Sequence, residues 1–224
     1  MLCLGESVHI NKKVSLNNNY GCTLFLGAIF LFGSLLSDKA SASDANSLIE
    51  SCFACHGKDG VSTQTKVPII AGYSEEYYGF SLHAYQRKER PCIEVEYLAG
   101  EKKGLKSDMC EIANNLSDSD IELIGEYFTK QKFVRMPQSY DAELEKKGEA
   151  VHISKCDPCH TKAGTSPSDN IGILGGQKMD YLREQIKFVR DGRRFTSKKM
   201  KLKLESLSDA DLEAVVHYYG SIQQ

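Results

Sequence analysis

The chain has 224 residues, of which 41% are hydrophobic and 26% are charged, and it contains no tryptophan. This composition is that of an ordinary soluble globular protein. The formal net charge is only −2. Without a basic tail or an aromatic platform, such a charge argues against a role in nucleic-acid binding. Eight cysteines are many for a chain of this length, so their spacing is the first guide to function.

Residues 1–42 have the pattern of a signal peptide. Lys12 and Lys13 precede an uncharged apolar run over residues 22–36, and Ala40-Ser41-Ala42 matches a small-residue cleavage site. We expect the mature chain to begin at Ser43, to be exported to the periplasm, and to keep no stable membrane span. The alternative is an uncleaved anchor, but this 15-residue run is shorter than the roughly 20 apolar residues that a span needs.

The next predicted helix, residues 43–52, leads into the pattern C-x-x-C-H at residues 52–56, which occurs again at 156–160. This pattern is the attachment signature of a c-type haem, in which two thiols form thioethers and the histidine binds the iron. The alternative, one zinc ion held by two C-x-x-C pairs, leaves both histidines unexplained. We predict two covalent haem c groups, with thioether bonds at Cys52, Cys55, Cys156 and Cys159 and proximal ligands at His56 and His160.

An internal repeat accompanies the two motifs. The motifs are 104 residues apart, and the same offset relates Ile70-Ala71-Gly72 to Leu174-Gly175-Gly176. Further along, the match continues at an offset of 91, so the first copy carries 13 extra residues between Arg90 and Met109. We therefore predict two tandem domains, at residues 43–135 and 136–224.

Each copy is expected to be helical throughout. Residues 75–87 and 178–190 each place apolar side chains on one helix face, and 141–155 approaches the second motif. Ser117 and Ser208 are predicted N-caps, each followed by aspartates in the first turn. No stretch predicts a strand or a hairpin. The expected fold class is all-α.

Two methionines occupy equivalent positions of the repeat. Met109 and Met200 each lie seven residues before the leucine that opens the capped helix. A thioether opposite histidine is the axial pair of electron-transfer cytochromes, so we predict both as axial iron ligands. The alternatives are that both methionines fill the core, or that a lysine binds the iron instead: Lys103, Lys106, Lys198 or Lys199.

The surplus segment of the first copy is bounded by two cysteines. Cys92 lies near its start, and Cys110 directly follows Met109. We predict a disulfide between them, which would fix the backbone beside the proposed ligand. Two free thiols, or a thiol reactive toward sulfur compounds, are the alternatives.

The remaining histidines and the basic residues are less specific. His83, His152 and His217 do not recur in the other copy, and we expect surface or hydrogen-bonded roles for them. Eight basic residues lie between Lys187 and Lys203, around Met200. They would steer an acidic redox partner to the second haem, or they would simply be solvated or offset haem propionates.

Together these features resemble tandem class I cytochromes c, in particular the dihaem c-four family. The chain is also similar to the cytochrome subunit of flavocytochrome c sulfide dehydrogenase. That likeness rests on residues 127–131, 140–144, 156–160, 173–177 and 193–200. It implies a redox partner that is an FAD-containing sulfide dehydrogenase subunit. The segment from Cys92 to Cys110 departs from the short connection of that family.

The function that we expect is electron transfer, with no catalytic residue of the chain's own. Filled axial positions leave an iron no site for substrate. The same-class alternative is a free-standing shuttle to a terminal oxidase. A dihaem peroxidase or a thiosulfate-oxidising enzyme would need an exchangeable iron ligand, against which the paired methionines argue.

Overall fold

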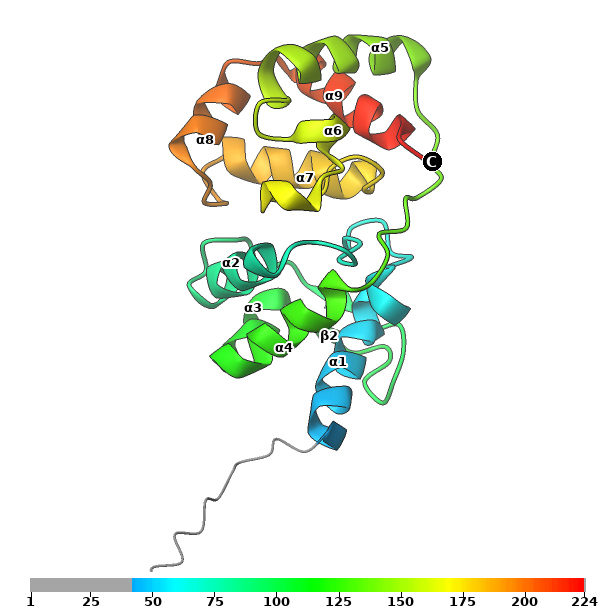
Figure 1. Cartoon of the computed structure of the whole chain (residues 1–224), viewed down its shortest axis with the longest axis vertical. Coiled ribbons are helices and arrows are strands. Elements are labelled where there is room, and N and C mark those ends of the chain that lie inside the picture. Colours follow the sequence, from blue (N-terminus) through cyan, green and yellow to red (C-terminus); the bar gives the residue numbers. More distant parts are fainter. Residues whose placement is uncertain (1–41, 224) are drawn as a thin grey trace, which may run out of the picture. The chain divides into compact units, whose positions relative to one another are not determined.

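The computed structural model describes residues 42–223, so the predicted signal segment lies outside the described residues except for Ala42. The described residues belong to one compact unit (Figure 1). Within the described range, the helices are all too short or too polar to cross a membrane.

The first half of this unit is mainly helical, and its main apolar core includes Tyr78, Ile121 and Phe128. Ser74 caps the helix that begins at Glu75 by accepting from the Tyr77 N–H at 3.2 Å. Ser117 forms a capping box with Asp120 at the start of the helix that begins at Asp118. Both caps are set by local sequence. The elements are α1 (Ala42–His56), the short turn η1 (Lys58–Gly60), α2 (Glu75–Gln86), β1 (Val95–Glu96), β2 (Lys106–Ser107), α3 (Met109–Asn114) and α4 (Asp118–Thr129).

The second half repeats the helical order. The predicted cap at Ser208 is confirmed, since it forms a second capping box with Asp211. The helix expected over 141–155 divides, because its last turn is a π-turn that ends at Cys156. The elements are α5 (Ala142–Val151), η2 (His152–Cys156), α6 (Thr161–Gly164), η3 (Pro167–Asp169), α7 (Met179–Arg190), α8 (Lys198–Glu205) and α9 (Asp209–Ser221).

Helices α5 and α9 pack closely at Gly148. A β-carbon on Gly148 would lie 2.0 Å from the Ala214 carbonyl oxygen of α9, so only glycine permits this approach. Beside this contact, Val215, Val216 and Tyr219 of α9 belong to the core of the second half. The crossing of α5 and α9 thus fixes the start of the second C-x-x-C-H motif.

The expectation that no strand occurs is wrong for the surplus segment. β1 and β2 pair antiparallel, with Val95 opposite Ser107 and Glu96 opposite Lys106. The Tyr97 N–H extends the hairpin by donating to the Leu105 carbonyl at 3.0 Å. With only two residues in each strand, the alternating pattern that signals a strand is too short to detect.

Side chains from the two halves meet at equivalent positions of the repeat. Gln177, which is fully buried, donates to the Tyr73 hydroxyl at 2.8 Å across a separation of 104 residues. The same amide accepts from the Ile69 N–H and donates to the Ile69 carbonyl. These hydrogen bonds satisfy buried polar groups of both halves at once.

Candidate functional site

The first C-x-x-C-H motif is the last turn of α1. Cys52 and Cys55, three residues apart on a helix, lie on one face and are both free thiols. Burial raises the pKa of Cys52 to about 11 and also raises that of Cys55. Both are therefore thiols, not thiolates, at neutral pH, and they are not activated nucleophiles.

His56 is held as a neutral imidazole with one free nitrogen. Its Nδ1 lies 3.0 Å from the Pro68 carbonyl oxygen, and because a carbonyl can only accept, Nδ1 carries the proton. Burial lowers the pKa of His56 to about 4, even though the Pro68 hydrogen bond acts to raise it. The Nε2 lone pair is left for a metal, in the arrangement that orients metal-binding histidines.

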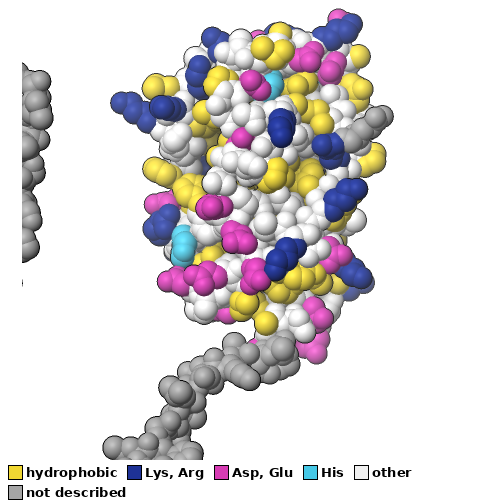
Figure 2. Space-filling view, viewed as in Figure 1, with side chains coloured by type: hydrophobic (Ala, Val, Ile, Leu, Met, Phe, Trp, Pro, Cys, Tyr) yellow, Lys and Arg dark blue, Asp and Glu magenta, His cyan; other side chains and the backbone are white. Residues whose placement is uncertain are grey.

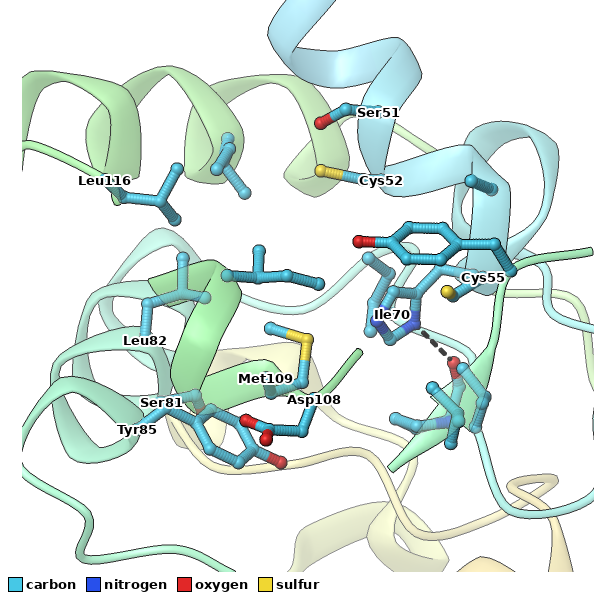
Figure 3. A pocket seen from close by; sticks show the side chains of 18 of the residues that line it. Ser51, Cys52, Cys55, Ile70, Ser81, Leu82, Tyr85, Asp108, Met109 and Leu116 are labelled. Carbon is cyan, nitrogen blue, oxygen red and sulfur yellow. Dashed lines mark hydrogen bonds between the residues drawn. The ribbon is translucent and has the colours of Figure 1, made fainter. Parts of the chain in front are cut away.

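A cavity of about 830 Å³ brings the first motif and Met109 together. Cys52, Cys55, His56 and Met109 all line it. Figure 3 shows the thioether of Met109 and the two cysteines extending into this space from α3 and α1. Two thiols, an imidazole and a thioether around one largely apolar cavity are the donor set of a c-type haem.

Arg90, in the wall of this cavity, provides a test of that fit. Its side chain is only 4% exposed, and its Nε has no hydrogen-bond partner among the described residues. It donates to the Tyr181 hydroxyl at 3.2 Å and lies over the Tyr85 ring. A buried cation with neutral neighbours lacks an anionic partner. A haem carries carboxylates, so the cavity fits it in charge as well as in donors.

The pKa of Tyr77 is affected by the same excess of positive charge. Burial alone would raise the pKa of Tyr77, but the charges of Arg90 and Arg194 outweigh it and lower the pKa to about 8. Arg194 lies 104 residues after Arg90, so the two arginines are repeat equivalents. Arg90 was not predicted as a functional residue, and Arg194 was predicted only as one of the basic residues around Met200. Their shared register was a signal that could have linked both to this site.

The second motif presents its residues differently. Cys156 is half-buried at the end of the π-turn and Cys159 is exposed. Nδ1 of His160 is buried without a hydrogen-bond partner in the described part of the chain, and burial lowers the pKa of His160 to about 4. An orphaned buried imidazole also fits a missing partner group.

Met200 lies on α8 and packs against the cluster of Val189, Leu204, Leu207 and Leu212. A second hollow of about 530 Å³ lies along α7 and α9, and neither His160 nor Met200 lines it. The structure thus gathers the predicted donors of the first centre around one cavity. It does not gather those of the second centre in the same way.

The other predicted residues are placed as follows. Cys92 and Cys110 form a disulfide. His83 is hydrogen-bonded to Gln86 at 2.8 Å, in line with the role expected for it. His152 is buried, and its Nδ1 lies 2.9 Å from the Tyr219 hydroxyl, so it is a hydrogen-bonded core residue.

Known proteins with similar sequences identify the family. Cytochrome c4 of Pseudomonas aeruginosa is 30% identical over 192 residues, which cover 80% of this chain and 86% of that protein. The chain belongs to the cytochrome c4 family. The family model described as cytochrome C oxidase, cbb3-type, subunit III, matches residues 143–218.

A solved structure supports the same assignment. Reduced recombinant cytochrome c4 from Pseudomonas stutzeri superposes with a TM-score of 0.63 at 28% identity, covering 81% of this chain and 98% of that one. Over a shorter stretch of 81 residues, the chain is 32% identical to the thiosulfate dehydrogenase electron acceptor of Stutzerimonas stutzeri, covering 36% of this chain and 32% of that protein.

These findings confirm three of the sequence predictions. The fold is the helical tandem of two class I cytochrome c domains. The cofactors of this cytochrome are two covalent haem c groups, and its activity is electron transfer.

Proposed function

We propose that this cytochrome is an exported electron carrier that accepts electrons from a sulfide dehydrogenase flavoprotein subunit. The observation that carries its role as a carrier is the cavity shared by Cys52, Cys55, His56 and Met109. The choice of donor is supported by the sequence likeness to the cytochrome subunit of flavocytochrome c over residues 127–200. Its place is the periplasm, after removal of residues 1–42.

In this proposal each domain, 43–135 and 136–224, holds one haem, which supplies a one-electron change between ferric and ferrous iron. The protein's part is to hold the iron coordinatively closed. His56 is oriented by the Pro68 carbonyl, and Met109 stands at the first turn of α3, where Asp108 caps the helix by accepting from the N–H groups of Cys110 and Glu111. The haems would be held by thioethers to Cys52, Cys55, Cys156 and Cys159, with His56 and Met109 as iron ligands of the first and His160 and Met200 as those of the second.

Haem content tests the attachment sites. Protein made with the haem-attachment machinery should have the mass of the chain plus two haems. The double variant Cys52→Ala/Cys55→Ala should carry one, because the motif at 156–160 is untouched. A single haem in the unmutated protein would contradict the two-site assignment.

Ligation is tested by removing each thioether. Met109→Ala and Met200→Ala should each abolish part of the far-red thioether–iron band of the ferric spectrum and lower one reduction potential, since a soft ligand that favours ferrous iron is lost. A spectrum unchanged in both variants would show that other residues are the ligands.

A second candidate donor is a thiosulfate dehydrogenase, which the match to an electron acceptor of that enzyme favours. The two donors differ in how they would associate with this protein. A flavoprotein subunit should copurify with the cytochrome from its native source as a stable complex, whereas a diffusing partner should not.

Basic residues around Met200 offer a docking surface for a diffusing partner. Arg190 and Lys187 are already paired with Asp209 and Asp191. Lys198 and Lys199 have no ion-pair partner in the described part of the chain. Figure 2 shows Lys and Arg side chains projecting at the side of the second half where α8 lies. Reversing Lys198 and Lys199 to Glu should slow reduction by an acidic donor at low salt, and about 1 M salt should abolish the difference.

A further inference from the structure

Lys178 is a residue of the second half that is buried in the first. It directly precedes α7 and is 5% exposed. Its ammonium donates to the carbonyl oxygen of Val67 at 3.0 Å and to that of Gln64. Both acceptors lie in the loop that follows the first C-x-x-C-H motif, more than 100 residues away in sequence.

The charge of Lys178 is not offset by a carboxylate. Both of its acceptors are neutral carbonyl groups, and within the described residues it forms no ion pair. Burial lowers the pKa of Lys178 to about 8, which still leaves it largely protonated at neutral pH. Burying an unpaired ammonium is costly, so a stabilising role for the charge alone is a poor explanation for it.

The loop that holds Lys178 also holds the proximal histidine. Val67 is followed by Pro68, whose carbonyl accepts from His56 Nδ1 at 3.0 Å. Burial lowers the pKa of His56, and the Pro68 hydrogen bond raises it. The charge of Lys178 is a third effect, and it lowers the pKa of His56 further. A cation from the second half therefore acts electrostatically on the first proximal ligand.

The second proximal histidine, His160, has a negatively charged neighbour instead of a positively charged one. Asp169 accepts from the N–H of Thr161, the residue after His160, at 2.7 Å. Burial and the charge of His152 lower the pKa of His160, while Asp169 raises it. Neither charge has a counterpart in the other copy, because the positions 104 residues before Lys178 and Asp169 are Ser74 and Thr65. The two proximal histidines thus have neighbours of opposite charge, Lys178 beside His56 and Asp169 beside His160.

We propose that Lys178 raises the reduction potential of the first haem, and that Asp169 lowers that of the second. A fixed positive charge favours ferrous over ferric iron, because the ferrous site carries one positive charge fewer. The second half of the chain would then tune the cofactor of the first, in addition to carrying its own. The inference rests on the proposed attachment of a haem at His56.

The experiment is a redox titration of the holoprotein in which NMR of the ferric haem methyls follows each haem separately. Lys178→Gln keeps a donor for the two carbonyls and removes the charge. We expect it to shift the reduction equilibrium of the first haem about tenfold toward ferric, or about 59 mV for a one-electron couple, with the second haem unchanged. Lys178→Arg keeps the charge and should leave both potentials within about twofold of the unmutated equilibrium.

Two further variants complete the design. Asp169→Asn keeps the acceptor for Thr161, and it should shift the second haem toward ferrous without moving the first. Lys132→Met, which removes an exposed lysine, is the matched control and should move neither.

Haem content by mass separates the possible failures. If Lys178→Gln loads two haems and its first potential equals that of the unmutated protein, the tuning role is refuted while the haem assignment stands. If the Lys178→Gln and Lys178→Arg variants shift the potential of the first haem equally, the effect is structural and the charge is not its cause. If the unmutated chain carries no haem at 52–56, the proposed function itself fails.

Discussion

The disulfide between Cys92 and Cys110 gives the sharpest prediction about stability. The bond closes a loop of sequence separation 18. Loop-closure entropy for that length is about −11 cal/mol/K, which corresponds to about 3 kcal/mol at 25 °C. The double variant Cys92→Ala/Cys110→Ala should therefore lower the free energy of unfolding by about this amount. Alanine suits the first turn of α3, where Cys110 is buried, so little helix propensity is lost.

The assay is guanidinium unfolding of the holoprotein at neutral pH, followed by far-UV circular dichroism. Unmutated protein with its disulfide reduced is the matched control, and it should show a similar loss. Because Cys110 adjoins Met109, the far-red ferric band of the first centre should weaken in the variant while that of the second is kept. A loss below about 1 kcal/mol would refute the argument that the bond constrains the unfolded chain.

Three further predictions concern the helices. Gly148→Ala should cost about 3 kcal/mol or more of unfolding free energy, because its β-carbon would meet the Ala214 carbonyl oxygen at 2.0 Å. Gly79→Ala on α2, where nothing lies within 4 Å, is the control and should be neutral or slightly stabilising; equal effects would contradict the close packing. Ser208→Ala should cost about 1 kcal/mol by removing the cap of α9, measured by the same unfolding titration; no loss would show that the cap is dispensable. Hydrogen bonds from Lys147 and then Ser208 lower the pKa of Asp211 from 3.8 to about 2. Its contribution to stability is therefore present above pH 4 and is lost as the pH falls from about 4 to 2. Asp211→Asn should flatten the pH dependence of the unfolding midpoint in that range, and an unchanged slope would argue against the pairing.

Much of the local structure followed from short-range patterns. Ser117 and Ser208 act as the predicted caps, since each capping box involves only the serine and the aspartate three residues later. The hairpin at 95–107 was missed because each strand has two residues. Its pairing depends on contacts across a turn, and no alternating pattern of that length stands out from a loop.

The residues of the candidate site were likewise predictable only in part. The residues of the first centre were predictable, because the motif at 52–56 and the register of Met109 are properties of the repeat. Arg90 was not predicted, because a basic residue near a loop is normally solvated. It becomes significant only when its burial and its unpaired Nε are seen.

The sequence by itself determined the two attachment motifs and the helices, because each depends on residues within a few turns of one another. It also determined the tandem repeat, because the chain matches itself at an offset of 104. Only the tertiary structure decided which charges face each centre. Lys178 reaches carbonyl groups 111 and 114 residues away, and Gln177 bonds to Tyr73 across 104. Such contacts arise when two folded halves pack together and bury polar groups that must find partners, and no local pattern in the chain encodes which partner each will find.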